Sequence, residues 1–481
     1  MILEHAAARP DDLAVDDLVR QRSFGGLVDR ARRLATLIAR SAPPGASIAS
    51  LTGNRVEVLE LALAATLAGV WWTPLDPHRG AAALAAVLAD ARPALVFGEP
   101  ERLGALPDGA LAVGPDLDAR LANTPPMALD LDGPAGGILR YTSGSTGRPR
   151  GVLRWQPATV GAALTHSARR ARSMGVPAGP HLVTGPLSHA APLGFAWMAL
   201  AAGAPVTLMP RWDARRALAL LEQRRIASAH LVPTMFRRLL ALPERERASA
   251  HRPERIFHGA APVGADDKRA MIDWWGEAVV EYWGCSETGV LTLSEAADWL
   301  AKPGTVGRAL PGFSVSAVDG RLHVRGQAPR LFAYWRDPTA TAAAHPAPGL
   351  VRTGDQGRVD ADGDVFLAGR ADRVLICGGV NVSPEAVEAV LEAMPGVTAA
   401  RVEGVADADL GQVVGAAVAG DVGREAVARW CADRLTGLER PRRIVVLAEL
   451  PHTPAGKVDR AALRRWLSRS GARTDSGPGE P

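Results

Sequence analysis

The stretch from Tyr141 to Val152 combines glycines, hydroxyl side chains and two arginines, a combination suited to binding phosphate. Glycines let backbone N–H groups approach an anion closely, hydroxyls donate hydrogen bonds to its oxygens, and Arg148 and Arg150 supply positive charge. The predicted phosphate-binding residues are Thr142, Ser143, Gly144, Ser145, Thr146, Gly147 and Arg150. The segment is not a Walker A loop, which requires a lysine directly after its last glycine. On composition alone, a flexible Ser/Gly linker is an equally good interpretation.

The composition describes an ordinary globular protein and gives little support to nucleic-acid binding. A chain of 481 residues is longer than one hydrophobic core usually holds, so two or more domains are expected. Hydrophobic residues make up 47% of the chain and charged residues 22%, which is the balance of a folded domain. The net charge of +4 is not concentrated in a dense basic segment, and it fits small anionic ligands as well.

Lysine is rare in this chain. Only Lys268, Lys302 and Lys457 are lysines among the 55 basic residues, so arginine is the default cation. Lysine presents a compact ammonium, whereas arginine presents a planar guanidinium with a fixed fork of donors. A lysine that is present despite this bias is therefore a candidate for a role that requires an ammonium.

The cysteines and the apolar segments favour a reduced protein in the cytoplasm. The cysteines are far apart and form no Cys-x-x-Cys pair, which argues against a zinc site; they are Cys285, Cys377 and Cys431. Residues 1–12 lack the basic region and apolar core of a signal peptide. The longest apolar runs, 61–72 and 195–209, are too short or are interrupted by Gly203 and Pro205, so no membrane span is expected.

The elements that must position the glycine-rich loop follow an α/β pattern. From residue 47 onward, short apolar runs alternate with segments of helical period, which predicts largely parallel sheets. The expected strands are 47–51, 94–97, 138–141, 181–184, 206–209, 229–232, 256–258 and 279–282. Between them, Asp213 can cap a helix with Leu218 and Leu221 on its apolar face. Ligands bind at the carboxyl ends of such strands, and the loops expected there begin near Thr142, Gly185, Gly259 and Gly284.

The second half of the chain changes in character twice. After Gly304, short strands with Gly, Pro and Asp between them predict a small β-rich subdomain that resembles a barrel. Within it, residues 360–364 begin like a calcium loop, but Val365 and Ala371 occupy two of its essential positions, so a hairpin turn is expected. Near residue 370 we place a boundary, beyond which Ser383 can cap a helix of a smaller α+β domain. The expected ranges are a large domain at 1–370, a small domain at 371–467 and a disordered tail at 468–481.

Five motifs together resemble the adenylate-forming superfamily. In order, they are the stretch from Tyr141 to Val152, Tyr282-Trp283-Gly284-Cys285-Ser286-Glu287-Thr288, Arg352-Thr353-Gly354-Asp355, Gly369-Arg370-Ala371-Asp372, and Pro451-His452-Thr453-Pro454-Ala455-Gly456-Lys457. That superfamily comprises acyl- and aryl-coenzyme A ligases, adenylation domains of nonribosomal peptide synthetases, and luciferases. The resemblance covers nearly the whole chain and is greatest to the fatty acyl- and aryl-coenzyme A ligases.

The resemblance implies a reaction in two steps. A carboxylate attacks the α-phosphate of ATP, giving an acyl adenylate and pyrophosphate, and the thiol of coenzyme A then displaces AMP. It implies ATP, Mg²⁺ and coenzyme A as ligands and a small carboxylic acid as substrate. It also implies that residues 1–370 bind ATP and the acyl group, and that residues 371–467 form a mobile lid.

The resemblance also assigns roles to single residues. Lys457 corresponds to the lysine that bridges the carboxylate and the α-phosphate, and Glu287 to the acidic residue that holds magnesium. The other nucleotide-binding positions are Trp283, Ser286, Asp355 and Arg370, and Asp372 is the hinge. Three positions depart from the family pattern: Arg150 replaces lysine, Trp283 replaces tyrosine and Ser286 replaces threonine. The first replacement puts the affinity for pyrophosphate in doubt, because a guanidinium reaches and hydrates differently.

The acyl-binding region favours a coenzyme A ligase over an amino-acid-activating domain. His189 corresponds to a histidine of the acyl site in such ligases. No aspartate lies between Gly185 and Pro210 to pair with a substrate ammonium, and a buried unpaired ammonium would be unfavourable. The expected acyl pocket contains small residues, namely Gly259, Ala260, Ala261, Gly284, Cys285 and Gly289. The expected coenzyme A tunnel contains Gly378, Gly379 and Val380.

Two alternatives to the coenzyme A ligase remain open. The enzyme could transfer the acyl group to a separate acyl carrier protein, since the chain carries no carrier domain of its own. It could also be a degenerate nucleotide-binding protein, since Arg150, Trp283 and Ser286 all replace the residues usual in the family.

Overall fold

The computed structural model describes residues 1–77, 81–142, 150–247, 251–261, 263–370, 375–377, 380–407, 410–435, 437–453 and 458–469. Its contacts divide the chain into two compact units. Unit 1 comprises residues 1–315, 324–352 and 360–365, and unit 2 comprises residues 316–323, 353–359 and 366–481. The expected division into functional domains at residue 370 stays a prediction.

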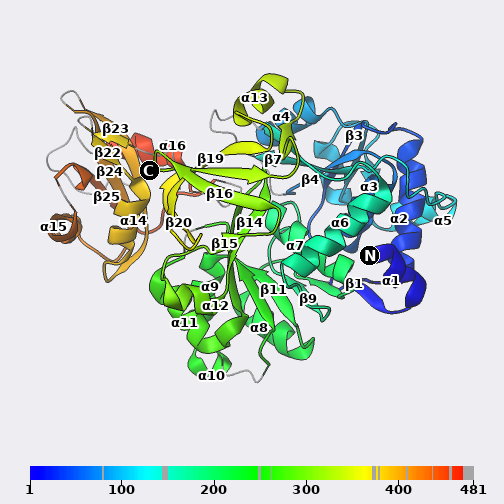
Figure 1. Ribbon diagram of the computed structural model, residues 1–481, viewed down its shortest axis with the longest axis horizontal. Helices are drawn as coiled ribbons and strands as arrows, with labels where there is room; N and C mark the ends of the chain where they lie inside the picture. Colours follow the sequence, from blue (N-terminus) through cyan, green and yellow to red (C-terminus); the bar gives the residue numbers. More distant parts are fainter. Residues whose placement is uncertain are drawn as a thin grey trace. The chain divides into compact units, whose positions relative to one another are not determined.

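Unit 1 contains a seven-stranded sheet that carries the glycine-rich stretch (Figure 1). Its strands, in spatial order, are β18 (Phe332–Tyr334), β8 (Arg150–Arg154), β7 (Gly137–Thr142), β4 (Trp71–Leu75), β3 (Ser47–Leu51), β5 (Leu95–Gly98) and β6 (Leu111–Ala112). The strands from β7 to β6 pair in parallel, whereas β7, β8 and β18 pair antiparallel. The parallel strands have few polar residues because helices cover such sheets on both faces.

A nine-stranded sheet forms the other half of unit 1. Its strands, in spatial order, are β15 (Arg308–Ala309), β14 (Gly289–Ser294), β13 (Val279–Cys285), β12 (Arg255–His258), β11 (Ser228–Leu231), β9 (His181–Val183), β10 (Val206–Leu208), β1 (Leu13–Asp16) and β2 (Gln21–Ser23). The central strands are parallel, and β13 turns back antiparallel into β14. All eight strands that the sequence predicts are present in the two sheets, with ends shifted by at most three residues.

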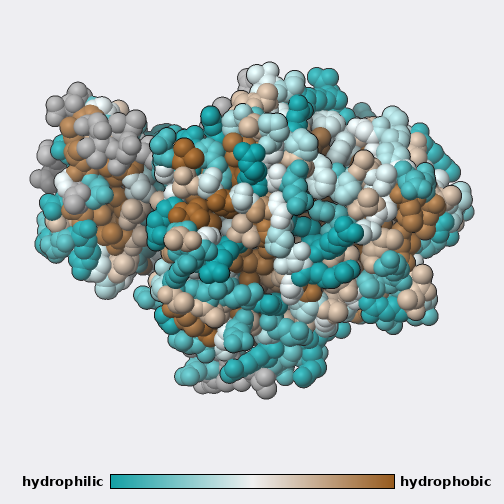
Figure 2. Space-filling view, in the orientation of Figure 1, coloured by the Kyte–Doolittle hydropathy of each residue, from teal (hydrophilic) through white to brown (hydrophobic). Residues whose placement is uncertain are grey.

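Helices connect these strands. They are α1 (Ile2–Ala8), α2 (Phe24–Ala39), α3 (Val56–Leu67), α4 (Ala81–Ala91), α5 (Pro115–Ala122), α6 (Val160–Ser173), α7 (Ala190–Ala202), α8 (Ala214–Gln223), α9 (Pro233–Leu240), α10 (Glu244–Arg247), α11 (Ala265–Trp275), α12 (Ala296–Ala301) and α13 (Pro338–Ala344). They range from α3, which is buried on nearly all sides, to amphipathic helices such as α8. The side chain of Asp213 caps α8, as the sequence predicts, by accepting a hydrogen bond from the N–H of Arg216. Figure 2 shows a largely hydrophilic surface over α8, while Leu218 and Leu221 of that helix are buried.

The main core of unit 1 lies between the helices and both sheets. Phe24 of α2, Trp72 of β4 and Phe195 of α7 are fully buried in one continuous apolar cluster. The two long apolar runs of the sequence end up here, since they form α3 with β4 and α7 with β10. None of the described helices is long and apolar enough to cross a membrane.

Unit 2 contains the smaller sheets and the helices that pack on them. The ends of β16 (Phe313–Val318), β17 (Arg321–Gly326), β19 (Leu350–Val359) and β20 (Val365–Arg370) belong to it and lie in one sheet in that order. The other elements are β21 (Leu375–Cys377), β22 (Val380–Val382), β23 (Val397–Asp407), β24 (Gly411–Gly420), β25 (Arg443–Leu447), α14 (Pro384–Glu392), α15 (Arg424–Arg434) and α16 (Arg460–Arg469). Ser383 caps α14 as predicted, and Val387 and Leu391 of that helix are buried against Val402 and Val414.

Candidate active site

The glycine-rich stretch connects two paired strands of unit 1. Strand β7 ends at Thr142 and β8 begins at Arg150, and these two residues are opposite each other in the antiparallel ladder. Residues 143–149, which include five of the predicted phosphate-binding positions, lie outside the described residues. The sheet pairs the two described ends of the stretch, Thr142 and Arg150; its phosphate-binding role stays a prediction, with a flexible surface linker as the alternative.

The residues at the end of this hairpin meet the predicted magnesium ligand. The guanidinium of Arg150 lies 4.7 Å from the centre of the Tyr334 ring, which is a cation–π contact. The hydroxyl of Tyr334 donates a hydrogen bond of 3.4 Å to Oε1 of Glu287. Burial raises the pKa of Tyr334, and the negative charge of Glu287 acts in the same direction. The phenol therefore stays protonated and keeps its donor toward the carboxylate.

Tyr334 was not among the residues that sequence reasoning selected. It lies on β18, almost fifty positions beyond Glu287, and the antiparallel pairing of Tyr334 with Val152 brings it to the site. The sequence does not predict this contact, because the contact depends on how β18 pairs at the edge of the sheet.

Arg154 supports the loop that carries Glu287 and Ser286. Its Nε donates to the carbonyl oxygen of Ser286 at 2.8 Å, and its Nη2 donates to that of Cys285 at 3.3 Å. Burial lowers the pKa of Arg154, and the anionic forms of Cys285 and Glu287 oppose this shift. Arg154 therefore places a cation directly behind the backbone of the predicted nucleotide-binding loop.

Cys285 is a half-buried thiol of low reactivity. Burial is the main cause that raises its pKa, to about 11, and the charge of Glu287 adds to it. Its Sγ lies 3.1 Å from Oγ1 of Thr288. At neutral pH the group is a thiol, and this agrees with a role in shaping a pocket rather than as a nucleophile.

Trp283 is placed within β13 and is 5% exposed, opposite Thr292 of β14. The indole that sequence reasoning assigned to adenine stacking therefore has little free surface in this conformation. Its role toward a nucleotide stays a prediction.

The glycines of the predicted acyl pocket have structural reasons of their own. A Cβ atom on Gly259 would lie 2.5 Å from the carbonyl oxygen of Tyr282, and one on Gly284 would lie 2.0 Å from that of Gly289. Gly289 itself has a φ of 80°, which side chains rarely adopt. Packing of β12, β13 and β14 therefore requires these glycines with or without a ligand.

The remaining predicted acyl-site residues of unit 1 differ in accessibility. Ala260 and Ala261 are exposed after the end of β12, and Ala260 has a φ of 65°, which is a strained conformation for alanine. His189 is exposed at the first turn of α7, where it occupies the N-cap position. An exposed imidazole is not the satisfied core histidine that was the alternative interpretation.

The predicted residues of unit 2 are described only in part. Asp355 lies on β19, where its N–H donates to Oγ1 of Thr353 at 3.2 Å, and its side chain is half-buried. Arg370 ends β20 and Val380 begins β22, but their side chains are not described. Asp372, Gly378, Gly379 and Lys457 lie outside the described residues, so their predicted roles are untested.

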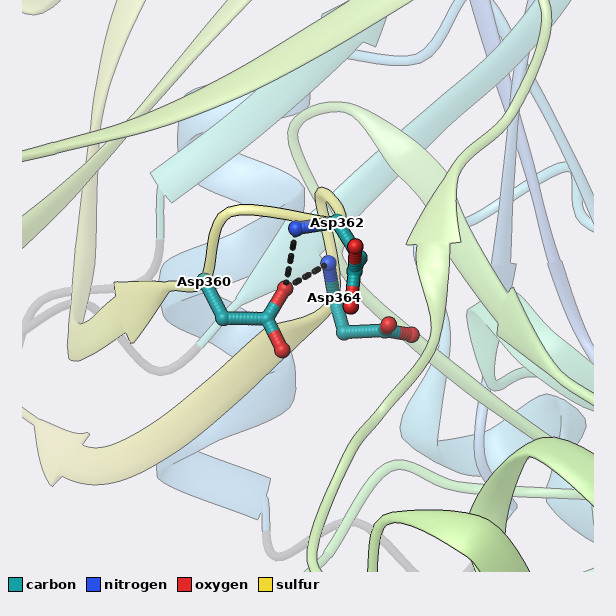
Figure 3. Close-up of side chains that lie close together, drawn as sticks. All are labelled: Asp360, Asp362 and Asp364. Carbon is teal, nitrogen blue, oxygen red and sulfur yellow. Dashed lines mark hydrogen bonds between the residues drawn. The ribbon is translucent and has the colours of Figure 1, made fainter.

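The acidic turn at residues 360–364 is a hairpin turn between β19 and β20, as the sequence predicts. Oδ1 of Asp360 accepts hydrogen bonds from the N–H groups of Asp362 and Asp364 (Figure 3). The ammonium of Lys302 donates to all three carboxylates at 2.6 to 2.8 Å. A lysine side chain therefore supplies the positive charge that this group of carboxylates requires.

The comparison with protein families gives one clear result. Residues 2–329 match the family described as AMP-binding enzyme, and residues 386–457 match the AMP-binding enzyme C-terminal domain.

Several curated proteins similar to this chain are named as coenzyme A ligases. A feruloyl-CoA synthase of an Amycolatopsis species is 32% identical, over 92% of this chain and 93% of that protein. An indoleacetate–CoA ligase of Aromatoleum aromaticum is 30% identical, over 97% of both chains. Among solved structures, ATP-bound MatB from Rhodopseudomonas palustris superposes with a TM-score of 0.83 at 28% identity, covering 96% of this chain and 98% of that one. The mixed α/β fold with a large first domain and a smaller second domain is thus confirmed.

Proposed function

The chain belongs to the AMP-binding enzyme family, and we propose on this premise that it is an ATP-dependent carboxylic acid:coenzyme A ligase. It forms an acyl adenylate and pyrophosphate from an acid and ATP, and then an acyl-coenzyme A thioester and AMP. The observation that carries the proposal is that relatives matched over more than nine-tenths of this chain, at 30% identity or above, are named as coenzyme A ligases. The chain is accordingly an AMP-forming acid–thiol ligase.

Most of the groups that we assign to ATP belong to unit 1, whereas Asp355 and Arg370 belong to unit 2. The loop of residues 142–147 would surround the phosphates, and Arg150 would add positive charge at its end. The position of this guanidinium over the Tyr334 ring fixes its direction, which supports arginine as a working substitute for the usual lysine. Ser286 and Trp283 would contact the α-phosphate and the adenine, while Asp355 and Arg370 would bind the ribose or phosphates.

Glu287 fits a magnesium ion by the chemistry of its donor atoms. Its carboxylate is half-buried and accepts the Tyr334 hydroxyl at one oxygen, which leaves lone pairs for a hard cation. A bound Mg²⁺ would neutralise charge on the phosphates. Tyr334 orients the carboxylate, and Arg154 holds the backbone on which it is mounted.

Lys457 and His189 would act on the carboxylate side of the reaction. We assign Lys457 to the bridging ammonium between the attacking carboxylate and the α-phosphate, where negative charge accumulates. His189 would border the acyl pocket, and Asp372 would be the hinge of the mobile second domain. Gly378, Gly379 and Val380 would line the path for coenzyme A.

The direct test is an acid panel. The purified protein is incubated with ATP, Mg²⁺, coenzyme A and a set of fatty and aromatic acids, and nucleotide products are separated by chromatography. We expect AMP with at least one acid, and ADP in its place would overturn the proposal.

A variant of Lys457 separates the two half-reactions. Lys457→Ala should lower acid-dependent pyrophosphate exchange by about a hundredfold to a thousandfold, the range for one electrostatic transition-state contact. It should still transfer the acyl group to coenzyme A from a supplied acyl adenylate. Equal loss of both steps would show that Lys457 also holds the second domain in place.

The acceptor of the acyl group has a test of its own. An amide bond synthetase of Marinactinospora thermotolerans shares the fold with a TM-score of 0.81 at 26% identity, so the fold also serves acceptors other than thiols. If adenylate forms but only an acyl carrier protein or an amine accelerates turnover, the acceptor assignment changes. We also propose the cytoplasm as the compartment, because Cys285, Cys377 and Cys431 are free thiols.

A further inference from the structure

Three arginines of unit 1 converge behind the β13–β14 hairpin. In the β7–β8 ladder, Arg140 is opposite Val152, so Arg140 and Arg154 lie on the same face of the sheet. Arg170 reaches the same region from α6. We call these residues the arginine cluster: Arg140, Arg154 and Arg170.

Hydrogen bonds tie two of these side chains to the hairpin. Arg154 donates to the carbonyl oxygens of Cys285 and Ser286, as described above. Arg170 donates through Nη2 to the carbonyl oxygen of Val290 at 3.1 Å. A Cβ atom on Gly289 would lie 3.1 Å from Nη1 of Arg154, so the guanidinium lies directly against this glycine. The cluster is therefore adjacent to Cys285 and Gly289, which belong to the predicted acyl pocket.

The cluster lacks the carboxylates that accompany other inward-facing arginines. Arg20, Arg22 and Arg30 form ion pairs of 2.7 to 2.8 Å with the buried Glu57 or Glu60. In contrast, among the described residues no carboxylate lies within ion-pair distance of Arg140, Arg154 or Arg170. Nε of Arg140 is buried and has no hydrogen-bond partner in the described part of the chain. Among the described residues, Glu287, which we assign to magnesium, is the carboxylate whose charge acts on the pKa of Arg154.

The electrostatics show that these positive charges are poorly compensated. Burial, and then the charge of Arg154, lowers the pKa of Arg140 well below its ordinary value. The same two causes lower the pKa of Arg170 to about 10. Arg140, Arg154 and Arg170 are each half-buried as whole residues, although Nε of Arg140 is itself buried. Ionisable groups whose pKa values are strongly perturbed by burial cluster at functional sites, where a ligand can supply the missing charge.

We propose that the arginine cluster binds a second carboxylate of the acid substrate, so that this enzyme activates dicarboxylic acids. The proposal rests on the ligase function proposed above and names its substrate class. A planar guanidinium binds a carboxylate through two parallel hydrogen bonds and remains charged at every physiological pH. The cluster contacts the backbone of Cys285 and lies against Gly289, both in the predicted acyl pocket, which favours the acid as its ligand.

Two other roles for the cluster make different predictions. A purely structural brace would hold the hairpin through its carbonyl oxygens and would treat all acids alike. A phosphate-binding role would affect ATP affinity equally with every acid. Both roles would leave the preference between acids unchanged when Arg140 is replaced.

The experiment compares acids that differ only in the second carboxylate. Initial rates of AMP release are measured for suberate against octanoate and for terephthalate against benzoate, with the full-length enzyme. The variants are Arg140→Met, Arg170→Met and the charge-retaining Arg140→Lys. The matched control is Arg169→Met, an exposed arginine on the same helix as Arg170. Binding of each acid without ATP is measured by calorimetry, which needs no turnover.

We expect at least one dicarboxylate to be preferred over its matched monocarboxylate. Arg140→Met and Arg170→Met should lower kcat/KM for that dicarboxylate by about tenfold to a hundredfold, the effect of losing a charged hydrogen bond. Both variants should leave the monocarboxylate within about twofold, and Arg140→Lys should recover part of the loss. Arg169→Met should behave as the wild type with both acids.

Three results would overturn the proposal and can be told apart. If AMP is released but no acid with a second carboxylate is preferred, the proposed ligase function stands and the proposed substrate class is wrong. A loss of ATP affinity in the variants, with an unchanged ratio between acids, assigns the cluster to phosphate. If no acid gives AMP and calorimetry detects no binding of a dicarboxylate, both the proposed ligase function and the proposed substrate class are wrong.

Discussion

Unit 1 contains two kinds of inward-facing cation, and they are built in opposite ways. The lysines Lys268 and Lys302 are paired with carboxylates: Lys268 is fully buried in an ion pair with Glu281, and Lys302 bridges three aspartates. The arginines Arg140 and Arg154 have only backbone carbonyls or no partner among the described residues.

The difference separates charges that serve the fold from charges available to a ligand. A buried ion whose partner is part of the chain is complete before any substrate arrives, and removing one partner leaves the other uncompensated. A buried ion without a partner lowers stability in the free protein and gains an interaction when an anion binds. Stability and activity measurements on the two groups should therefore respond in opposite directions.

The largest effect is expected at the fully buried pair. Lys268→Ala leaves the carboxylate of Glu281, 7% exposed, without its partner and should lower the free energy of unfolding by about 3–5 kcal/mol. Urea denaturation followed by tryptophan fluorescence measures this. The double variant Lys268→Met with Glu281→Met should recover most of the loss. If the free energy of unfolding falls by less than about 1 kcal/mol, this pair contributes no more than an exposed ion pair does.

A smaller effect is expected at Lys302, and it depends on pH. Hydrogen bonding from Lys302 holds the pKa of Asp360 below its ordinary value of 3.8. Burial opposes ionisation of Asp364, but hydrogen bonds from Lys302 and Arg308 still lower its pKa. Because these folded-state values are depressed, the stabilisation is present above pH 3.8 and is lost as the pH falls through them.

The Lys302→Met variant should therefore have a lower melting temperature than the wild type at neutral pH, and the difference should shrink below pH 3.8. Thermal unfolding recorded over a pH series measures this, with Lys302→Arg as the control that retains the charge. If the difference in melting temperature between the variant and the wild type stays constant below pH 3.8, the role assigned to the three aspartates is wrong.

The opposite sign is expected at the arginine cluster. Arg140→Met removes an uncompensated charge and keeps a similar length of side chain, so the free energy of unfolding should stay within about 1 kcal/mol of the wild type or rise. The same urea titration measures it, with Arg169→Met as the reference. Strong destabilisation would show that Arg140 belongs with the lysines and has a structural partner.

The smallest effect is expected at the hydroxyl of Tyr334, which connects β18 at the sheet edge to Glu287. Tyr334→Phe removes one hydrogen bond of 3.4 Å to Glu287 and keeps the ring beneath Arg150. We expect kcat/KM for adenylate formation to fall by roughly threefold, the effect of one weak neutral donor. Tyr334→Ala removes the ring as well and should lower it further. Equal rates for both variants would show that the hydroxyl, and not the ring, is what matters.

Some parts of this site were predictable from the sequence because the signals are local. The short apolar runs predicted all eight strands, and Asp213 and Ser383 marked helix starts through side chains that bond within one turn. The hairpin turn at residues 360–364 followed in the same way from its Asp and Gly residues. The strands β1 and β2 before residue 47 were not predicted, because β2 consists of polar residues and β1 lies between aspartates, so neither forms a clear apolar run.

Other parts were not predictable, because they depend on register and on which strands lie side by side. Tyr334 reaches Glu287 because β18 pairs with β8 at the edge of the sheet. Arg154 reaches Ser286 because the two sheets of unit 1 meet at these residues. The small size of Gly259, Gly284 and Gly289 predicts space for a substrate. The structure shows that close backbone packing or backbone conformation requires them in any case.

The sequence by itself determined the family and its chemistry, since five ordered motifs place hydroxyls, carboxylates and one lysine for adenylate formation. Only the tertiary structure decided which charges are compensated, because charge pairing joins residues far apart along the chain, such as Lys302 and Asp360 at a separation of 58 positions. The energy of a buried ion depends on what lies within a few ångströms of it, and composition does not record that.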